Sequence, residues 1–530
     1  MSGFRLHDVW DALRSRHGYT HYAHRTASRL DRIYVTQLLL SRKQGVEIIA
    51  TAFTDHLVVL LRLAIDKPIP SAGRGYWRMN VSFLHEQTFR DDLATRWAQW
   101  QHNKRFYPNS VLWWVRYVKR MVRQMFTSEG TNRRRDRQTL ENFYYDAIYT
   151  VLQEETLTDK TYVTLKKLKA KIVRLHHEPK KRLLLHTEDQ DKCEDETPSL
   201  YHVLKMRKRQ ESRMIDRVYD SEGHLQTSPL AILRVFTEFM KNKYDTITVD
   251  ADSIRRILRH SYSKMPLIAN EALDAPITME ELHIAVKQGK KLKAPGYDGI
   301  CHDFFQLAWE TTKVDLLDVM NQMFIDGSLL DTQKHGIIVC LPKTNRPVHP
   351  EEYRPLTLLN ADYKLLSRLI ANRLRPWMNE LLHPSQHCGI RDNNILGAIS
   401  ALRETIANVE LTNEPTCLLS LDFKGAFDNI AHSYLFAVLA SYGFNTCFQE
   451  RLQRMYDNAT SSVQVNGHIS SPLPIKCSVR QGCPLSMLLF TICLDPLLRM
   501  LDDKLNAIKT RGRKKRTAVI AYADDVTIIL

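Results

Sequence analysis

The 530-residue chain lacks several features that would place it in a familiar class of protein. Its nine cysteines form no CxxC pair and no spacing typical of a zinc site, so we expect them to be reduced. There is no apolar stretch of signal-peptide length near the N-terminus and no uncharged apolar run of membrane-spanning length. No internal repeat is visible. We therefore expect a cytoplasmic and/or nuclear protein, neither secreted nor inserted in a membrane.

The charge of the chain is unbalanced. Its 75 Lys and Arg residues outnumber its 59 Asp and Glu residues, which gives a formal net charge of +16. A strongly basic chain favours an anionic partner such as nucleic acid. The length allows roughly two to four domains, and a hydrophobic content of 44% is sufficient for sizeable cores.

The last stretch of the chain, residues 518–530, reads AVIAYADDVTIIL. Two apolar runs flank Ala523, Asp524 and Asp525, a pattern that predicts a strand, a tight turn and a strand. The turn has no glycine, although hairpin turns favour Asn-Gly or Asp-Gly. Two carboxylates about 4 Å apart repel by roughly 4 kcal/mol at an effective dielectric of about 20, so this pair suggests a divalent metal site. A simple Asp-containing turn with both side chains in water is the alternative.

A second stretch, residues 417–430, reads CLLSLDFKGAFDNI. Its apolar run ends abruptly in Asp422, and a helix is predicted over residues 432–442, closed by Gly443. One acid at a strand end and an acid pair on a hairpin provide the oxygen ligands needed to hold two Mg²⁺ ions around a nucleoside triphosphate.

With these motifs the chain resembles the reverse transcriptases, most closely those of non-LTR (LINE-type) retrotransposons. YADD (residues 522–525) resembles the catalytic hairpin of the family, and DFKGAFD (422–428) resembles its first catalytic motif. Between them, RQGCPLS (480–486) resembles the motif that opens the long palm helix. The resemblance covers residues 271–530 strongly and residues 1–66 weakly.

The resemblance implies an α+β fold with the fingers and palm of a right-hand polymerase, including a ferredoxin-like palm sheet. Because the sequence stops at Leu530, we expect the thumb to be missing. The implied domains are a remnant of an α/β-sandwich nuclease (1–66), a mainly helical connector (67–270), and truncated fingers and palm (271–530).

The function implied by the resemblance is RNA-directed DNA polymerisation, in which dNTPs are added to a DNA primer on an RNA template by two-metal phosphoryl transfer. The partners would be the RNA template, the DNA primer or target DNA, and dNTPs. Asp422, Asp524 and Asp525 would be the catalytic acids and the ligands of two Mg²⁺ ions, with Mn²⁺ as a substitute.

The family motifs also imply contacts to the nucleotide. Lys343 and Arg354 would bind the triphosphate, the lysine as a point charge and the arginine as a planar fork. Phe427 would lie under the incoming sugar and exclude a 2′ hydroxyl. Gln481 and Gly482 would meet the nascent base pair.

Near the N-terminus, three residues form a separate candidate site: Asp31, Asp55 and His56. An Asp on one strand and an Asp-His pair on another can build a dyad that positions a phosphodiester. The arrangement resembles the C-terminal end of an apurinic-endonuclease-like domain, in which His56 would be catalytic and Asp31 would orient it. We interpret the segment as an endonuclease remnant that cannot cut by itself.

In the connector, aromatic residues alternate with basic ones over residues 90–130 and include Trp97, Trp100, Trp113 and Trp114. They either stack on RNA bases or form the buried face of amphipathic helices, and the second reading is the more common outcome. TNRRRDR (131–137) predicts a basic loop.

Two other functions remain open at this point. The chain could be a non-catalytic nucleic-acid-binding relic of such an element. It could also be a viral RNA-directed RNA polymerase, although Ala523, where such enzymes usually have Gly, and Phe427 both argue against that reading.

Overall fold

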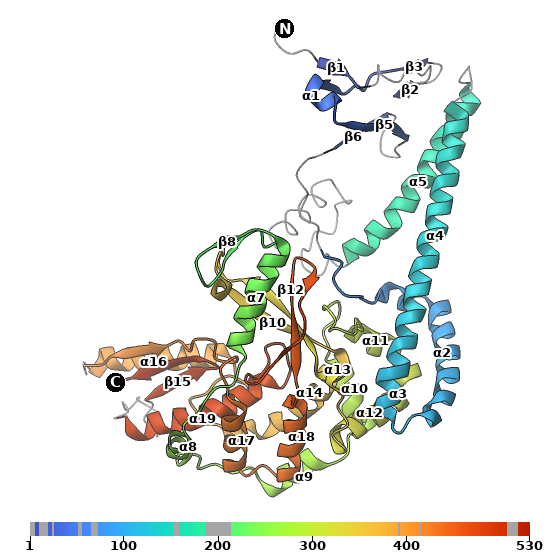
Figure 1. Ribbon diagram of the computed structural model, residues 1–530. Coiled ribbons are helices and arrows are strands. Elements are labelled where there is room, and N and C mark those ends of the chain that lie inside the picture. Colours follow the sequence, from blue (N-terminus) through green and yellow to red (C-terminus); the bar gives the residue numbers. More distant parts are fainter. Residues whose placement is uncertain are drawn as a thin grey trace. The chain divides into compact units, whose positions relative to one another are not determined.

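The computed structural model describes residues 6–9, 20–23, 26–50, 56–64, 73–152, 158–185, 214–390, 393–412, 415–505 and 518–530 (Figure 1). The chain divides into two compact units. Unit 1 consists of Met1–Ser71 and Gln124–Glu211, and unit 2 consists of Ala72–Arg123 and Ser212–Leu530. Within the described ranges, no helix is both long enough and apolar enough to cross a membrane.

Unit 1 combines short antiparallel strand pairs with long helices. The pairs are β1 (Leu6–Asp8) with β4 (Tyr34–Thr36), β2 (His21–Ala23) with β3 (Thr26–Ser28), and β5 (Lys43–Ala50) with β6 (Leu57–Leu63). Its helices are α1 (Gln37–Leu40), α5 (Asp159–Leu185) and most of α4 (Lys119–Leu152). An apolar cluster of Leu57, Ile148, Leu165 and Ile172 holds β6 against both long helices.

Residues 131–137, predicted as a basic loop, lie inside α4, so that prediction is wrong. The segment contains neither glycine nor proline, and Arg133 pairs with Glu129 one turn earlier at 2.5 Å. Charged residues that pair at a spacing of four stabilise an exposed helix even when the segment has little apolar surface.

The aromatic residues of the connector form a core within unit 2. They lie on α2 (Gln87–His102), α3 (Ser110–Trp113) and η4 (Trp114–Val118), with η2 (Val81–His85) and η3 (Asn103–Phe106) beside them. Trp97, Trp100, Trp113 and Trp114 are all buried, which confirms the prediction of a buried helix face. The indole N–H of Trp97 donates to Asp315 at 2.9 Å, so its polar atom is satisfied as well.

The larger sheet of unit 2 has the strand order β10-β9-β12-β13, with β14 also paired to β12. The strands are β9 (Gly336–Pro342), β10 (Tyr353–Leu359), β12 (Thr460–Val465), β13 (His468–Ile469) and β14 (Leu473–Pro474). Helix α7 (Pro229–Lys243) lies along this sheet (Figure 1) and buries Phe236 and Met240 against Ile338 and Val463. Its start is fixed by the Ser228 side chain, which accepts from Ala231 N, and by a proline in the first turn.

The smaller sheet carries the acidic motifs. Its order is β11-β16-β15, all antiparallel, with β11 at Leu418–Leu421, β15 at Val519–Tyr522 and β16 at Asp525–Ile529. Helix α16 (Ile395–Thr412) packs on it through Ala398 and Ala401. Tyr522 pairs with Asp525, so the turn consists of Ala523 and Asp524 alone and Asp525 already belongs to the strand.

The remaining elements of unit 2 surround the two sheets. They are β7 (Val218–Tyr219), β8 (Leu225–Gln226), α8 (Ala251–Leu258), α9 (Leu267–Asp274), α10 (Met279–Lys287), α11 (His302–Leu307), α12 (Trp309–Ile325), α13 (Asp331–Lys334), η5 (Pro350–Glu352), α14 (Ala361–Leu374), η6 (Arg375–Trp377), α15 (Met378–Leu381), α17 (His432–Ser441), α18 (Thr446–Tyr456) and α19 (Ser486–Lys504). Gly443 follows α17 with φ of 75°, as the predicted closure of this helix requires.

A buried ion cluster ties the connector to the region that follows it. The Lys119 ammonium lies 2.7 Å from a carboxylate oxygen of Asp298 and 2.7 Å from one of Asp362. Gln333 also donates to Asp362, at 2.9 Å. Burial alone would lower the pKa of Lys119, but the two carboxylates outweigh burial and raise it. Lys119 is therefore charged in the folded protein and neutralises part of the cluster.

Replacing Lys119 with Met should lower the free energy of unfolding of unit 2 by about 3 kcal/mol, because two buried carboxylates would lose their shared cation. Urea denaturation of the full chain, followed by tryptophan fluorescence, measures this change. Lys313→Met is the matched control, since Lys313 pairs with Glu310 at the surface and should contribute less than about 1 kcal/mol. Equal effects of the two substitutions would contradict the role given to Lys119.

Candidate active site

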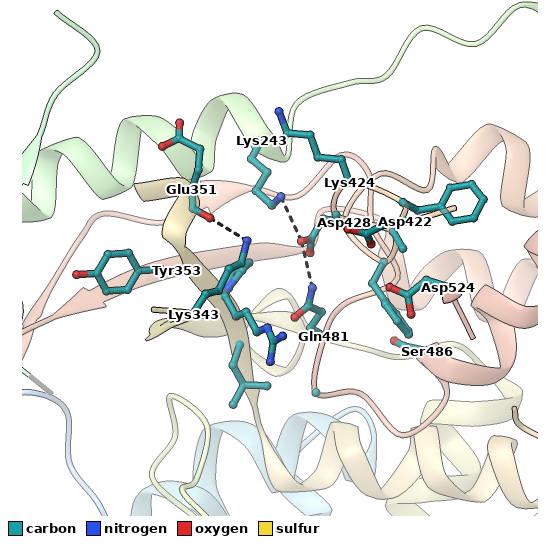
Figure 2. Close-up of a pocket in the computed structure, with 18 of the residues that line it drawn as sticks. Lys243, Lys343, Glu351, Tyr353, Asp422, Lys424, Asp428, Gln481, Ser486 and Asp524 are labelled. Carbon is teal, nitrogen blue, oxygen red and sulfur yellow. Dashed lines mark hydrogen bonds and ion pairs between the residues drawn. The ribbon is translucent and has the colours of Figure 1, made fainter. Parts of the chain in front are cut away.

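Strand pairing brings the two acidic motifs together. Asp422 directly follows Leu421, the last residue of β11, and Leu421 pairs with Val526 of β16. Asp524 lies in the turn that joins β15 to β16. Asp422 and Asp524 consequently line one cavity of about 790 Å³ (Figure 2). Asp525 is exposed and is not among the residues that line this cavity.

The same cavity is lined by every predicted nucleotide contact, namely Lys343, Arg354, Phe427, Gln481 and Gly482. These residues come from β10 and from loops that are far apart in the sequence. A cavity of this size is in the range of small-molecule sites. Their convergence is a finding of the structure, whereas their roles as ligands stay predictions.

Lys343 and Arg354 lie together because β9 and β10 form an antiparallel pair in which Pro342 faces Tyr353. The Lys343 ammonium donates to the backbone oxygen of Glu351 at 2.8 Å (Figure 2). The Arg354 side chain is exposed at the edge of the cavity. Two cations therefore border one side of the space that Asp422 and Asp524 border on another.

Gly482 occupies a position that no other residue fits without strain. Its φ is 102°, and a Cβ added there would lie 2.6 Å from the backbone oxygen of Thr357. The preceding residue, Gln481, accepts from Thr357 N at 3.0 Å through its backbone oxygen. The loop that precedes α19 is thus pressed directly against β10, which leaves its other side open to the cavity.

Phe427 stacks on Phe490 of α19, with ring centroids 4.6 Å apart and an interplanar angle of 22°. The contact fixes the phenyl ring at the cavity wall. Phe427 is only partly buried, in keeping with its place in the cavity lining.

Asp428 is the centre of a network that sequence reasoning missed. Its buried carboxylate accepts from the Gln481 carboxamide at 3.1 Å and lies 3.2 Å from the Lys243 ammonium (Figure 2). It also accepts from the Tyr244 hydroxyl at 3.1 Å. Burial raises the pKa of Asp428, although Lys243 acts in the opposite direction. The motif contained Asp428, but no spacing in the sequence pointed to Lys243 and Tyr244 at the end of α7.

The acids at the cavity suit a divalent cation. Within the part of the chain that the structure describes, no side chain donates a hydrogen bond to the Asp422 or Asp524 carboxylate, so their oxygens are available as ligands. Among those same residues, no group of three or more His, Cys, Asp or Glu is placed to hold a metal ion by itself. Mg²⁺ is commonly held by one or two carboxylates plus substrate phosphates, so the pair fits such an ion in the presence of a nucleotide.

Comparisons with known proteins agree with this site. Residues 341–530 match the family model described as reverse transcriptase (RNA-dependent DNA polymerase). The chain carries a reverse transcriptase domain of the non-LTR retrotransposon type. The domain implies the palm and fingers fold of a polymerase, with which the mixture of helices and sheets in unit 2 is compatible.

Three relatives of the reverse transcriptase domain span much of the chain. The uncharacterized 149 kDa protein of transposon TX1 from Xenopus laevis is 26% identical over 99% of this chain and 40% of the relative. The Pol polyprotein of retrotransposable element R2 from Popillia japonica is 29% identical over 48% of the chain and 35% of the relative. The RNA-directed DNA polymerase of mobile element jockey from Drosophila melanogaster is 24% identical over 62% of the chain and 35% of the relative. The chain thus spans less than half the length of each of these relatives.

In unit 1, the predicted His-carboxylate pair is present. His56 Nδ1 lies 2.7 Å from Asp31 Oδ2, and this hydrogen bond lowers the pKa of Asp31. The ring of His21 lies beside His56, with centroids 4.6 Å apart. Asp55, the third predicted residue, lies outside the described residues. The contact is compatible with an endonuclease remnant, which stays a prediction.

The guanidinium of Arg480, directly before Gln481, is buried beside a histidine. It donates to the backbone oxygens of Lys334 at 2.5 Å and Thr460 at 3.3 Å. His335 Nδ1 lies 2.8 Å from the Thr460 hydroxyl. Burial, together with the nearby Arg480, lowers the pKa of His335 to about 4.

Acid should destabilise unit 2 through His335. In the unfolded chain the imidazole binds a proton below about pH 6.5, while in the folded protein it does so only below about pH 4. Protonation between these values therefore favours the unfolded state. The stability contribution of neutral His335 is complete above pH 6.5 and is lost as the pH falls towards 4, by up to about 3 kcal/mol.

Urea denaturation at a series of pH values, with wild type and His335→Gln compared, measures this contribution. Other buried histidines titrate in both proteins and cancel in the difference. We expect the stability of the wild type to fall more steeply between pH 6.5 and 4.5 than that of the variant. Parallel pH profiles would contradict the assignment.

Proposed function

We propose that the chain acts as an RNA-directed DNA polymerase of a non-LTR retrotransposon, adding dNTPs to a DNA primer on an RNA template. The observation that carries the proposal is the joint lining of one cavity by Asp422, Asp524, Lys343 and Arg354. Acids and cations that face one another across such a cavity suit a metal-bound triphosphate.

Reverse transcriptase domains use divalent metal ions, typically Mg²⁺. We propose that Asp422 and Asp524 hold two such ions together with the triphosphate, and that Asp525, at the start of β16, completes the set. When bound, the ions would lower the pKa of the primer 3′ hydroxyl and neutralise charge on the departing pyrophosphate. The protein itself contributes chiefly position, because phosphoryl transfer requires little further chemistry from side chains.

On the nucleotide side, Lys343 and Arg354 would bind the triphosphate oxygens. Phe427, held by its stack on Phe490, would occupy the space that a ribose 2′ hydroxyl needs. Gln481 and Gly482 would border the new base pair. The hydrogen bond from Gln481 to Asp428 supports this by fixing the loop before α19 to the loop that carries Phe427.

A second cavity of about 710 Å³ supports a nucleic-acid template as partner. It shares Gly482 and Cys483 with the first cavity, and its basic lining residues are Lys290, Lys293, Lys364, Arg368 and Arg375. No acidic residue is among the described residues that line it. Such a surface binds phosphates, so the strand that enters beside Gly482 would be the template.

The proposal extends to the organisation of the chain. It assigns residues 271–530 to fingers and palm, residues 67–270 to a helical connector, and residues 1–66 to an endonuclease remnant. The pair of His56 and Asp31 supports the last assignment.

Primer extension on poly(rA)/oligo(dT) with Mg²⁺ tests the proposed activity. Asp524→Asn should reduce the rate by about 100-fold or more, because one of the charged ligands at the reacting phosphate is lost. Asp503→Asn is the matched control, since this partly exposed Asp of unit 2 pairs with His260 and is not among the residues lining the cavity. Equal extension by wild type and Asp524→Asn would reject the enzyme and favour a non-catalytic nucleic-acid-binding relic.

The choice between dNTP and rNTP tests the role of Phe427. Phe427→Val should increase rNTP incorporation relative to dNTP incorporation by about tenfold or more, because the smaller side chain leaves room for the 2′ hydroxyl. Phe427→Tyr keeps the ring and should retain the preference for dNTPs. The measurement is the ratio of kcat/KM for dTTP and UTP on the same primer-template. A ratio unchanged by the Val substitution would remove Phe427 from the sugar site.

A further inference from the structure

The turn that carries Asp524 has an unfavourable backbone. Ala523 has φ of 55°, in the left-handed region that residues with a side chain disfavour. Glycine would adopt this conformation freely, yet the turn contains none. Another part of the molecule must therefore hold Ala523 in place, since a strained conformation persists only where its surroundings fix it.

The fully buried side chain of Gln386 makes the required contacts. Its Oε1 accepts from Ala523 N at 3.0 Å, and its Nε2 lies 3.4 Å from the Ala523 oxygen, to which it donates. Oε1 also accepts from Cys388 N at 2.9 Å. The Gln386 carboxamide thus forms hydrogen bonds with both the backbone N–H and the backbone oxygen of Ala523.

The backbone around Gln386 is itself fixed to the hairpin. Gln386 forms a parallel bridge with Ala521 of β15. Ala521 N donates to the Ser385 oxygen at 2.9 Å, and His387 N donates to the Ala521 oxygen at 2.8 Å. These bonds set the Gln386 side chain at the level of the turn, so its contacts with Ala523 are a consequence of strand register.

We propose that Gln386 is a positioning residue that holds Ala523 in its left-handed conformation and thereby directs Asp524 into the cavity shared with Asp422. The inference rests on the proposed polymerase function for its catalytic consequence, but the hydrogen bonds themselves do not depend on that function. Glutamine is suited to this position because one neutral side chain both accepts and donates. An ionised glutamate could not donate and would place a buried charge near Asp524.

Gln386→Met keeps the length of the side chain and removes its hydrogen bonds. We expect kcat for primer extension to fall between about 10- and 100-fold, because a small displacement of a catalytic group has effects of this order. KM for the dNTP should change less than about threefold, since the triphosphate contacts are on other elements. Gln449→Met is the matched control, because it removes the bond from Gln449 to the Phe444 oxygen elsewhere in unit 2 and should leave kcat unchanged.

A second substitution separates positioning from general stability. Glycine at position 523 tolerates positive φ without support, so adding Ala523→Gly to Gln386→Met should restore kcat by about fivefold. A glycine that merely loosened the hairpin would lower kcat further. Failure of the rescue would overturn the proposal.

Hydrogen exchange of the full chain, followed by mass spectrometry, provides a measurement independent of activity. In Gln386→Met, a peptide containing Ala523 should exchange faster, while a peptide containing Val463 of β12 should be unchanged. If both peptides exchange faster to the same extent, or neither does, Gln386 has no specific role at the hairpin. If wild type shows no primer extension but the exchange result holds, the polymerase proposal fails while the structural role of Gln386 stands.

Discussion

The pairing of β11 with β16 is the constraint on which the site depends. Asp422 and Asp524 come from distant parts of the sequence and meet only because Leu421 lies opposite Val526, next to the hairpin turn. A register slip of one residue would turn the side chains of a strand to the opposite face of the sheet. Val526 and Ile528 share one face of β16 and are buried, and such a slip would move them to the face that carries the exposed Asp525 and the half-buried Thr527, which is unfavourable. The apolar residues that flank the acids therefore determine the position of the acids.

A second constraint is the close approach of the loop before α19 to β10. It requires a glycine at position 482, and it places Gly482 and Cys483 between the two cavities. One cavity contains acids and cations, and the other is lined by basic side chains without acidic ones among the residues described there. The two cavities therefore differ in the charge of their linings, as the proposed binding of a triphosphate in one and of a nucleic-acid strand in the other requires.

The sequence predicted the parts of the site that depend on local pattern. The strands around the YADD turn, the strand ending before Asp422 and the helix closed by Gly443 follow from apolar runs and from turn and cap residues, and the structure contains them. The grouping of Lys343, Arg354 and Phe427 was predicted by family resemblance and not by any pattern in the chain. Lys243, Tyr244 and the contacts of Gln386 were not predicted, because a hydrogen bond between residues far apart in sequence has no periodic signature. The error at residues 131–137 has a similar origin, since stabilisation by ion pairs leaves no apolar pattern.

The acidic residues of unit 2 differ in their side-chain partners, and this difference separates the acids with a structural role from those that line the cavity. Asp362 is paired with Lys119 and Asp495 with Arg499, while Asp428 has Lys243, Tyr244 and Gln481 as partners. Buried carboxylates require such partners to remain charged without a large cost. Asp422 and Asp524 have no comparable partner among the described side chains, although Lys343 and Lys424 line the same cavity. Asp422 is exposed and Asp524 is half-buried, so both carboxylates are open to the cavity, and under the proposed function a divalent cation with its nucleotide would supply the positive charge that they lack.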